Sequence, residues 1–226
     1  MIEKKKQLVI FGAFDGIDFE SISNLLELKT KYPFILIGKE EVQTFPISAS
    51  RPIDIPPTVI RPVLMTPDKK FSVFFGRKRI HVEELDSDVL TYDDFISKAE
   101  DLIVSIMSSF KLSINRIAVN GIAMSTDQNY SNKIFNKFFK KNSFNDQMSD
   151  DWGFRVNYKF INKEQKPINR IITANQRKEL IDNQPTDALY ITYDYNTFPN
   201  QTFSDKEIGS FIKEAIGFRK KVLLDE

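Results

Sequence analysis

The clearest alternation of hydrophobic and polar positions lies in residues 92–111. Apolar residues recur there at spacings of three and four, which places eight of them on one stripe of a helix. They are Phe95, Ile96, Ala99, Leu102, Ile103, Ile106, Met107 and Phe110. The other side is polar, and Thr91 with Asp94 resembles the capping pattern of a helix N-terminus. The sequence therefore predicts an amphipathic helix that covers a sheet.

Three short segments before this helix have the composition of strands. Residues 59–65, 70–75 and 78–85 are rich in β-branched and aromatic residues, and proline or glycine stands at the junctions between them. Residues 114–122 continue the pattern after the helix. The sequence predicts a three-strand meander, a covering helix and a return strand.

A second set of elements follows in the same order. Residues 153–161, 168–174 and 188–195 are predicted strands, and a final helix begins at a capping box of Ser204 and Glu207 and stops at Gly217. The two sets share element order and no residue-level repeat. We therefore expect an α+β fold of two antiparallel-sheet-plus-helix halves, each a strand meander followed by a covering helix.

The expected boundaries are 1–124 for the first half, 125–151 for a connecting segment with a short basic helix, and 152–226 for the second half. One continuous domain is the alternative. Near the N-terminus we expect a buried strand over residues 7–14, a helix over 18–28 capped by Asp18, and a strand over 34–37. Four prolines in residues 43–57 predict an extended connection.

Composition excludes several classes of protein. The 32 basic and 31 acidic residues leave a net charge of +1, so no global field attracts nucleic acid or an anionic membrane. The chain has no cysteine, which excludes disulfides, thiolate catalysis and cysteine-type zinc sites. No run reaches the roughly 20 apolar residues of a membrane-spanning helix. These features predict a cytoplasmic protein without membrane contact.

Candidate catalytic groups do not form a recognisable set. His81 is the one histidine, and we interpret it as structural because no nucleophile accompanies it. The turn that contains Gly12 and Gly16 lacks the spacing of a phosphate-binding loop. Asp151, Glu164 and Lys166 imitate the acidic and Glu-x-Lys pattern of metal-dependent nucleases, but Glu164 and Lys166 lie in a predicted hairpin turn, where side chains would point into solvent. We expect no catalytic residue, no metal ligand and no cofactor.

The strongest candidate for binding is a basic amphipathic helix over residues 130–141. An apolar stripe of isoleucine and phenylalanines stands beside four lysines. One interpretation is an ordinary helix that packs on the sheet with a solvated lysine face. The other is a helix that binds a partner or contacts phosphates, joined by basic residues of a hairpin. The candidate binding residues are Lys133, Phe135, Lys137, Phe138, Lys140, Lys141, Arg77, Lys78 and Arg79.

Several segments resemble a sporadically distributed, functionally uncharacterised family of bacterial proteins of similar size. The resemblance runs from Arg61-Pro62-Val63 through Ser72, Tyr92 and the long helix to residues 114–122, and from 190 to 218. Val119-Asn120 stands where the family has an arginine-tyrosine pair. The family supplies no catalytic residues, and its patchy distribution implies mobile-element or antiviral defence neighbourhoods.

The sequence thus predicts a non-enzymatic protein-interaction component of a bacterial multi-protein system, with antiviral defence as the setting that the resemblance implies. The expected partner is another protein. The alternatives are a nucleic-acid-binding accessory protein, which would use a local basic patch, and a metal-dependent nuclease. Self-association through an exposed sheet edge is a further option.

Overall fold

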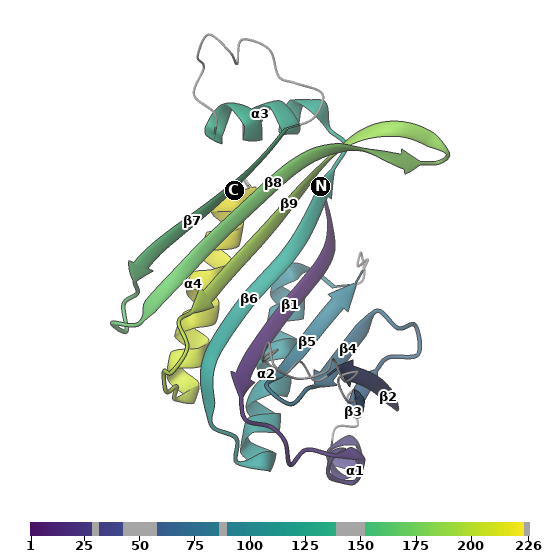
Figure 1. Ribbon diagram of the computed structural model, residues 1–226, viewed down its shortest axis with the longest axis vertical. Helices are drawn as coiled ribbons and strands as arrows, with labels where there is room; N and C mark the ends of the chain where they lie inside the picture. Colours follow the sequence, from purple (N-terminus) through teal and green to yellow (C-terminus); the bar gives the residue numbers. More distant parts are fainter. Residues whose placement is uncertain (29–31, 43–57, 86–89, 139–151, 224–226) are drawn as a thin grey trace, which may run out of the picture.

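The computed structural model describes residues 1–28, 32–42, 58–85, 90–138 and 152–223. They form one antiparallel sheet of nine strands and four helices (Figure 1). The strands are β1 Ile2–Gly12, β2 Ile35–Val42, β3 Thr58–Met65, β4 Phe71–Phe75, β5 Arg79–Leu85, β6 Ile114–Ser125, β7 Trp152–Ile161, β8 Pro167–Ile181 and β9 Gln184–Thr197. The helices are α1 Phe19–Leu28, α2 Tyr92–Phe110, α3 Gln128–Phe138 and α4 Asp205–Leu223. The predicted α+β class is confirmed.

The strand order is β2-β3-β4-β5-β1-β6-β9-β8-β7. The first strand of the chain lies in the middle, where β1 pairs with β5 on one side and β6 on the other. Eight register pairs join β6 to β9. The predicted division into two halves is therefore not confirmed, because the strands of both halves belong to one continuous sheet. The predicted connection over residues 43–57 lies outside the described residues.

Both predicted meanders are present, as β3-β4-β5 and β7-β8-β9. The β8–β9 hairpin is longer than predicted and extends past the rest of the sheet (Figure 1). Its turn consists of Asp182 and Asn183, both with positive φ, as a two-residue type I′ hairpin requires. Pairing with β7 ends at Gln176 and pairing with β6 ends at Leu189. Among the described residues, 177–188 therefore form a two-stranded ribbon with both outer edges unpaired.

The predicted helix caps are confirmed, with one exception. Thr91 Oγ1 accepts a hydrogen bond from Asp94 N at 3.1 Å and caps α2. Ser204 and Glu207 form the capping box of α4. The prediction that Gly217 ends this helix is wrong: α4 continues to Leu223. Gly217 does not have a positive φ, and buried residues at helical spacing continue beyond it.

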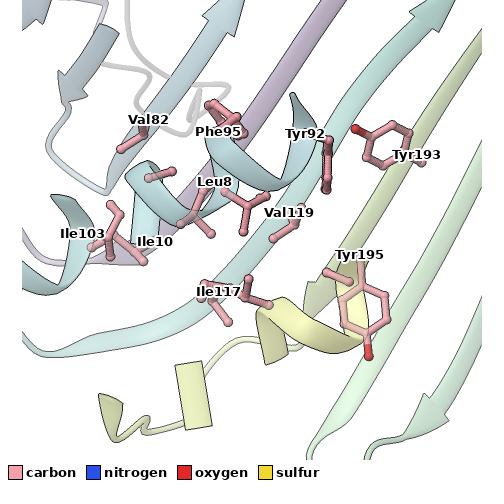
Figure 2. Packing of buried hydrophobic residues seen from close by; sticks show 14 of the residues in the cluster. Leu8, Ile10, Val82, Tyr92, Phe95, Ile103, Ile117, Val119, Tyr193 and Tyr195 are labelled. Atoms are coloured by element: carbon pink, nitrogen blue, oxygen red, sulfur yellow. The ribbon is translucent and has the colours of Figure 1, made fainter. Parts of the chain in front are cut away.

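The main core lies between the sheet and the two long helices. Figure 1 shows α2 and α4 on the same side of the sheet. Leu8, Ile10 and Val119 of the central strands pack in one cluster with Phe95 and Ile103 of α2 (Figure 2). Each such side chain contributes about 1.5–3 kcal/mol when fully buried. Among the described helices, α2 and α4 therefore both cover the same face of the sheet.

A polar network crosses this core between α2 and α4. The Tyr193 hydroxyl donates to Glu3 Oε1 at 2.9 Å, and Arg219 Nε donates to the same oxygen at 3.0 Å. The Arg219 guanidinium lies 4.5 Å from the Tyr92 ring centroid, and Figure 2 shows Tyr92 beside Tyr193. Burial raises the pKa of Tyr193, so its hydroxyl stays protonated and donates. The network joins β1, α2, β9 and α4, which belong to both predicted halves.

Candidate functional site

The predicted basic helix corresponds to α3, which is docked on the fold. The Phe135 ring meets the Trp152 ring edge to face at 5.5 Å between centroids. The Tyr130 hydroxyl donates to the carbonyl of Leu223, and Lys137 Nζ donates to the carbonyl of Lys221 at 2.9 Å, both at the end of α4. In the described part of the chain, α3 is thus a packed helix.

The candidate residues of α3 have different roles in the structure. Lys133 is exposed, while Phe135 and Lys137 contact neighbouring elements. The side chain of Phe138, together with Lys140 and Lys141, lies outside the described residues.

The basic hairpin residues lie far from α3. Arg77 pairs with Asp15 at 2.5 Å, and its backbone N donates to Glu41, whereas Lys78 and Arg79 are exposed. Arg79 is in register with one end of β1, and the other end of β1 pairs with β6 next to α3. At about 3.3 Å per residue, the two groups are roughly 30 Å apart. They do not form one surface, because β1 separates them along its length.

The residues of the nuclease hypothesis contact α4 in the structure. Glu164 accepts a hydrogen bond from the Ser210 hydroxyl, and Lys166 Nζ pairs with Glu207 at 3.1 Å. The expectation that Glu164 and Lys166 point into solvent is therefore wrong, because the β7–β8 turn packs on α4. Asp151 lies outside the described residues. Within the ranges that the structure describes, no three acidic or histidine side chains gather to hold a metal ion.

His81 lies on the sheet face away from α2, with 5% of its surface exposed. Its ring contacts the Phe74 ring at 5.1 Å between centroids, and its Nε2 lies 3.8 Å from Glu83 Oε2. Nδ1 is buried without a hydrogen-bond partner. Burial lowers the pKa of His81 to about 4, against the attraction of Glu83. The imidazole is therefore neutral at pH 7, in agreement with a structural role.

The residues that the structure brings together lie on the uncovered side of β7, β8, β9 and β6. Ile172 and Tyr193 point into the core, so the residues that alternate with them point away from the helices. Register aligns these outward residues in rows that cross the four strands. The rows are Arg155–Thr173–Thr192–Ile122, Asn157–Ile171–Asp194–Asn120 and Lys159–Asn169–Asn196–Ala118. We call these twelve residues the open face.

A hydrogen-bonded cluster lies at the third row of the open face and includes Arg116 of β6, outside the twelve residues; we call this cluster the centre. Arg116 Nη2 and Asn169 Nδ2 both donate to Asn196 Oδ1 at 3.1 Å, and the Arg116 guanidinium lies 4.8 Å from the Phe11 ring centroid. Burial raises the pKa of Asp194, while Asn196 and the nearby arginines oppose the shift. This centre is polar, yet it lies on a sheet rather than in a core.

Three polar atoms of this centre have no hydrogen-bond partner. They are Arg116 Nε, Asp194 Oδ1 and Asn196 Nδ2, and all three are buried. A buried polar group without a partner costs about 1–3 kcal/mol, so such groups call for water or a bound partner. Because all three atoms are buried, water or a partner would reach them only after the side chains around them shift.

The edge of the open face is exposed and basic. Arg155, Asn157 and Lys159 of β7 are all exposed, and Thr192 of β9 is exposed between them and the centre. Ile122 and Ile171 add half-buried apolar surface. The face is thus a flat mixture of amide, hydroxyl, cationic and apolar groups.

The sequence carried a signal for this surface that residue-type motifs do not reveal. In β7 and β9, outward positions at a spacing of two are polar, such as Arg155, Asn157 and Lys159, and Thr192, Asp194 and Asn196. This alternation indicates strands with one face in contact with solvent. Only the register, which depends on pairing between distant strands, shows that these positions form continuous rows.

Comparisons with known proteins add no family. No protein-family model matches the chain, and no curated protein matches it. The resemblance to an uncharacterised bacterial family therefore remains a prediction. Among the helices that the structure describes, none combines the length and apolar character needed to cross a membrane.

Proposed function

We propose that this chain is a non-enzymatic binding protein that docks a partner protein on the open face. The observation that carries the proposal is the set of polar rows on β7, β8, β9 and β6, left uncovered because α2 and α4 both pack on the other side. The exposed side chains of Arg155, Asn157, Lys159 and Thr192 supply the donors and acceptors that a partner can reach.

The composition of the open face favours a protein over a nucleic acid. Its exposed cations are Arg155 and Lys159, which is fewer than the 6–10 phosphate contacts typical of strong DNA binding. Amides, hydroxyls and half-buried isoleucines make up the remainder, which is the mixture found in protein interfaces.

Two arginine substitutions on the open face separate these alternatives. Asn157→Arg with Thr192→Arg adds bulk and charge at exposed strand positions, so a docked protein would be displaced, whereas nucleic acid would bind more tightly. The matched control is Ser97→Arg with Ser108→Arg on the exposed side of α2. The measurement is affinity purification from the native host after nuclease treatment, with the recovered proteins quantified by mass spectrometry.

We expect the wild-type chain and the α2 variant to recover equal amounts of the same partner protein. The open-face variant should recover at least about tenfold less of it. Equal recovery by all three chains would contradict the proposal. In a separate assay without nuclease, tighter binding of purified DNA or RNA by the open-face variant, with a steeper salt dependence, would favour the accessory nucleic-acid-binding alternative.

The enzymatic alternative makes a separate prediction. A metal-dependent nuclease that uses Glu164 would cleave DNA or RNA in the presence of Mg²⁺ or Mn²⁺ and lose this activity in Glu164→Ala. Because Glu164 hydrogen-bonds to Ser210 of α4, we expect no cleavage by the wild-type chain. Divalent-dependent cleavage that disappears in Glu164→Ala would replace our proposal.

We also propose that the sheet consists of two related halves. Each half supplies one central strand, a short helix, a three-strand meander and a long helix: β1, α1, β3-β4-β5 and α2, then β6, α3, β7-β8-β9 and α4. From the β1–β6 pair outward, the strand order is β5-β4-β3 on one side and β9-β8-β7 on the other. This order supports an internal duplication in which β2 is an addition at one edge. A role in a bacterial multi-protein system stays part of the proposal on the resemblance alone, and a cytoplasmic location stays part of it on the composition.

A further inference from the structure

A recess lies on the helix-covered side of the sheet. The turn between β7 and β8 and the C-terminal half of α4 enclose a cavity of about 330 Å³. This volume lies in the range of small-molecule sites, which begins at about 300 Å³. The open face lies on the other side of β8 and β9, so the two surfaces are separate.

The cavity contains an arginine without an acidic partner. The Arg170 guanidinium stacks on the Phe160 ring at 3.8 Å and lies 5.5 Å and 5.8 Å from the ring centroids of Tyr195 and Phe218. Its Nε is buried without a hydrogen-bond partner, and no carboxylate of the described residues forms an ion pair with it. The aromatic rings fix the guanidinium plane and leave its edge available for an anion.

Further groups of the cavity complement this cation. Lys163 and Lys221 line the cavity and are exposed, so their ammonium groups can reach the same anion. Glu214 accepts a hydrogen bond from the Tyr195 hydroxyl through Oε2 at 2.5 Å, while its Oε1 is buried without a partner. Burial and the Glu214 carboxylate raise the pKa of Tyr195, which keeps its hydroxyl protonated as the donor. Oε1 is therefore an acceptor that a ligand N–H or O–H would satisfy once the groups that cover it move aside.

The helix side of the cavity is open at Gly217. A Cβ atom added at this position would have no heavy atom within 4 Å, so a side chain there would project into free space. Phe218, the next residue, and Phe160 across the cavity supply apolar rings. A planar ligand group can lie against these rings.

We propose that this cavity binds a small organic anion with a planar ring. Its carboxylate or phosphate would pair with Arg170, Lys163 and Lys221, its ring would contact Phe160 and Phe218, and an N–H group would donate to Glu214 Oε1. The site uses no residue of the open face, so the test of this site and the test of the proposed partner protein have independent outcomes.

Calorimetric titration of the full chain tests this site. Adenosine 5′-monophosphate supplies a ring, an N–H donor and a phosphate, and indole-3-acetate supplies a ring, an N–H donor and a carboxylate. Adenosine and inorganic phosphate are the half-ligands. We expect at least one complete probe to bind with a Kd below about 1 mM, and each half-ligand at least about tenfold more weakly. The probe that binds more tightly identifies the phosphate or the carboxylate as the preferred group.

Two variants locate the binding. Gly217→Leu fills the cavity and should weaken binding at least about tenfold, while Gly16→Leu, at another glycine with free space around its Cβ position, should not change it. Lys163→Glu reverses the charge of an exposed turn residue and should also weaken binding about tenfold, which keeps the test valid if Gly217→Leu impairs folding. Failure of both complete probes to bind would overturn the inference. Binding unchanged in both cavity variants, or phosphate alone binding as tightly as the nucleotide, would overturn it as well.

Discussion

The buried imidazole of His81 makes the stability of the protein depend on pH. Its pKa falls from the ordinary 6.5 to about 4 in the folded chain, because burial disfavours the imidazolium form and Arg79, Lys5 and Lys39 oppose it further. A lowered folded-state pKa means that the stabilisation is present above pH 6.5 and is lost as the pH falls towards 4. We expect the free energy of unfolding to fall by about 2 kcal/mol between pH 7 and pH 5 for this reason.

Urea denaturation of the wild-type chain and of His81→Gln at several pH values measures this effect. Glutamine does not titrate, so the free energy of unfolding of the variant should fall less over the same interval. The difference in this free energy between the two chains should therefore narrow as the solution becomes acidic. Parallel curves for both chains between pH 7 and pH 5 would show that His81 does not contribute.

Individual side chains show why the candidate binding residues were only partly predictable. Lys137 looks like a free cation in the sequence, but it donates to the carbonyl of Lys221, 84 residues away. Arg77 of the β4–β5 turn likewise pairs with Asp15 of the segment after β1. Contacts of this kind depend on tertiary structure, which residue type and helical spacing do not contain. The open-face asparagines were missed because they form no motif, and only the register of distant strands brings them together.

Two glycines in regular elements differ in the space around their Cβ positions. A Cβ at Gly121 in β6 would lie 2.7 Å from the Lys5 carbonyl oxygen and against the Tyr193 ring, whereas a Cβ at Gly217 in α4 would meet nothing. We expect Gly121→Ala to destabilise the fold by about 1–3 kcal/mol through overpacking. Gly217→Ala should stabilise it by about 1 kcal/mol, because alanine is the better helix former.

Thermal and chemical denaturation of the two alanine variants provide the comparison. Both variants add one methyl group, so the contrast isolates the space around each site. If Gly121→Ala and Gly217→Ala are equally stable, β1 and Tyr193 shift to accommodate the methyl group at position 121. Gly121 would then not be required for their packing.

Elements with a strong local pattern were predictable, and their extensions were not. The stripe and cap of α2 and the strands of the β3-β4-β5 meander are confirmed within a few residues, because burial on one face imposes a period. The end of the β8–β9 hairpin was missed, since Arg177, Lys178 and Glu179 bury nothing and show no hydrophobic alternation. The Asp182-Asn183 turn was the available signal.

Unfolding of the whole chain tests how its parts depend on one another. The β6–β9 pairing and the contacts of Glu3 with Tyr193 and Arg219 join the first and second predicted halves within one sheet and one core. We therefore expect a single cooperative transition, with coincident curves for secondary and tertiary structure. Separate chains of residues 1–124 and 152–226 should show no cooperative transition, because each exposes an unpaired central strand.

Circular dichroism in the far and near ultraviolet measures both expectations, with the full chain as the reference. Two resolved transitions, or a cooperative transition in either fragment, would establish that the predicted halves are independent domains. In that case the division of the chain into 1–124 and 152–226 would be confirmed.

The order of strands is the part of the fold that the sequence does not specify locally. β1 is the first strand of the chain, yet its partners are β5 and β6, with register pairs such as Val9 with His81 and Val9 with Ala118. Pairings over such separations depend on which apolar faces meet in three dimensions. The same limit applies to the open face and the cavity, which form only when four strands and α4 assemble.

The ribbon at the end of the β8–β9 hairpin has a consequence for self-association. Its unpaired backbone could template strands of other molecules, and Leu180 is 76% exposed there. The pair beside a two-residue turn is hydrogen-bonded, so the backbone of the next pair, Leu180 with Pro185, points outward. Pro185 has no N–H to offer at that position. A neighbouring molecule therefore cannot extend the β9 edge as an uninterrupted ladder, so fibril growth is blocked on that side of the ribbon.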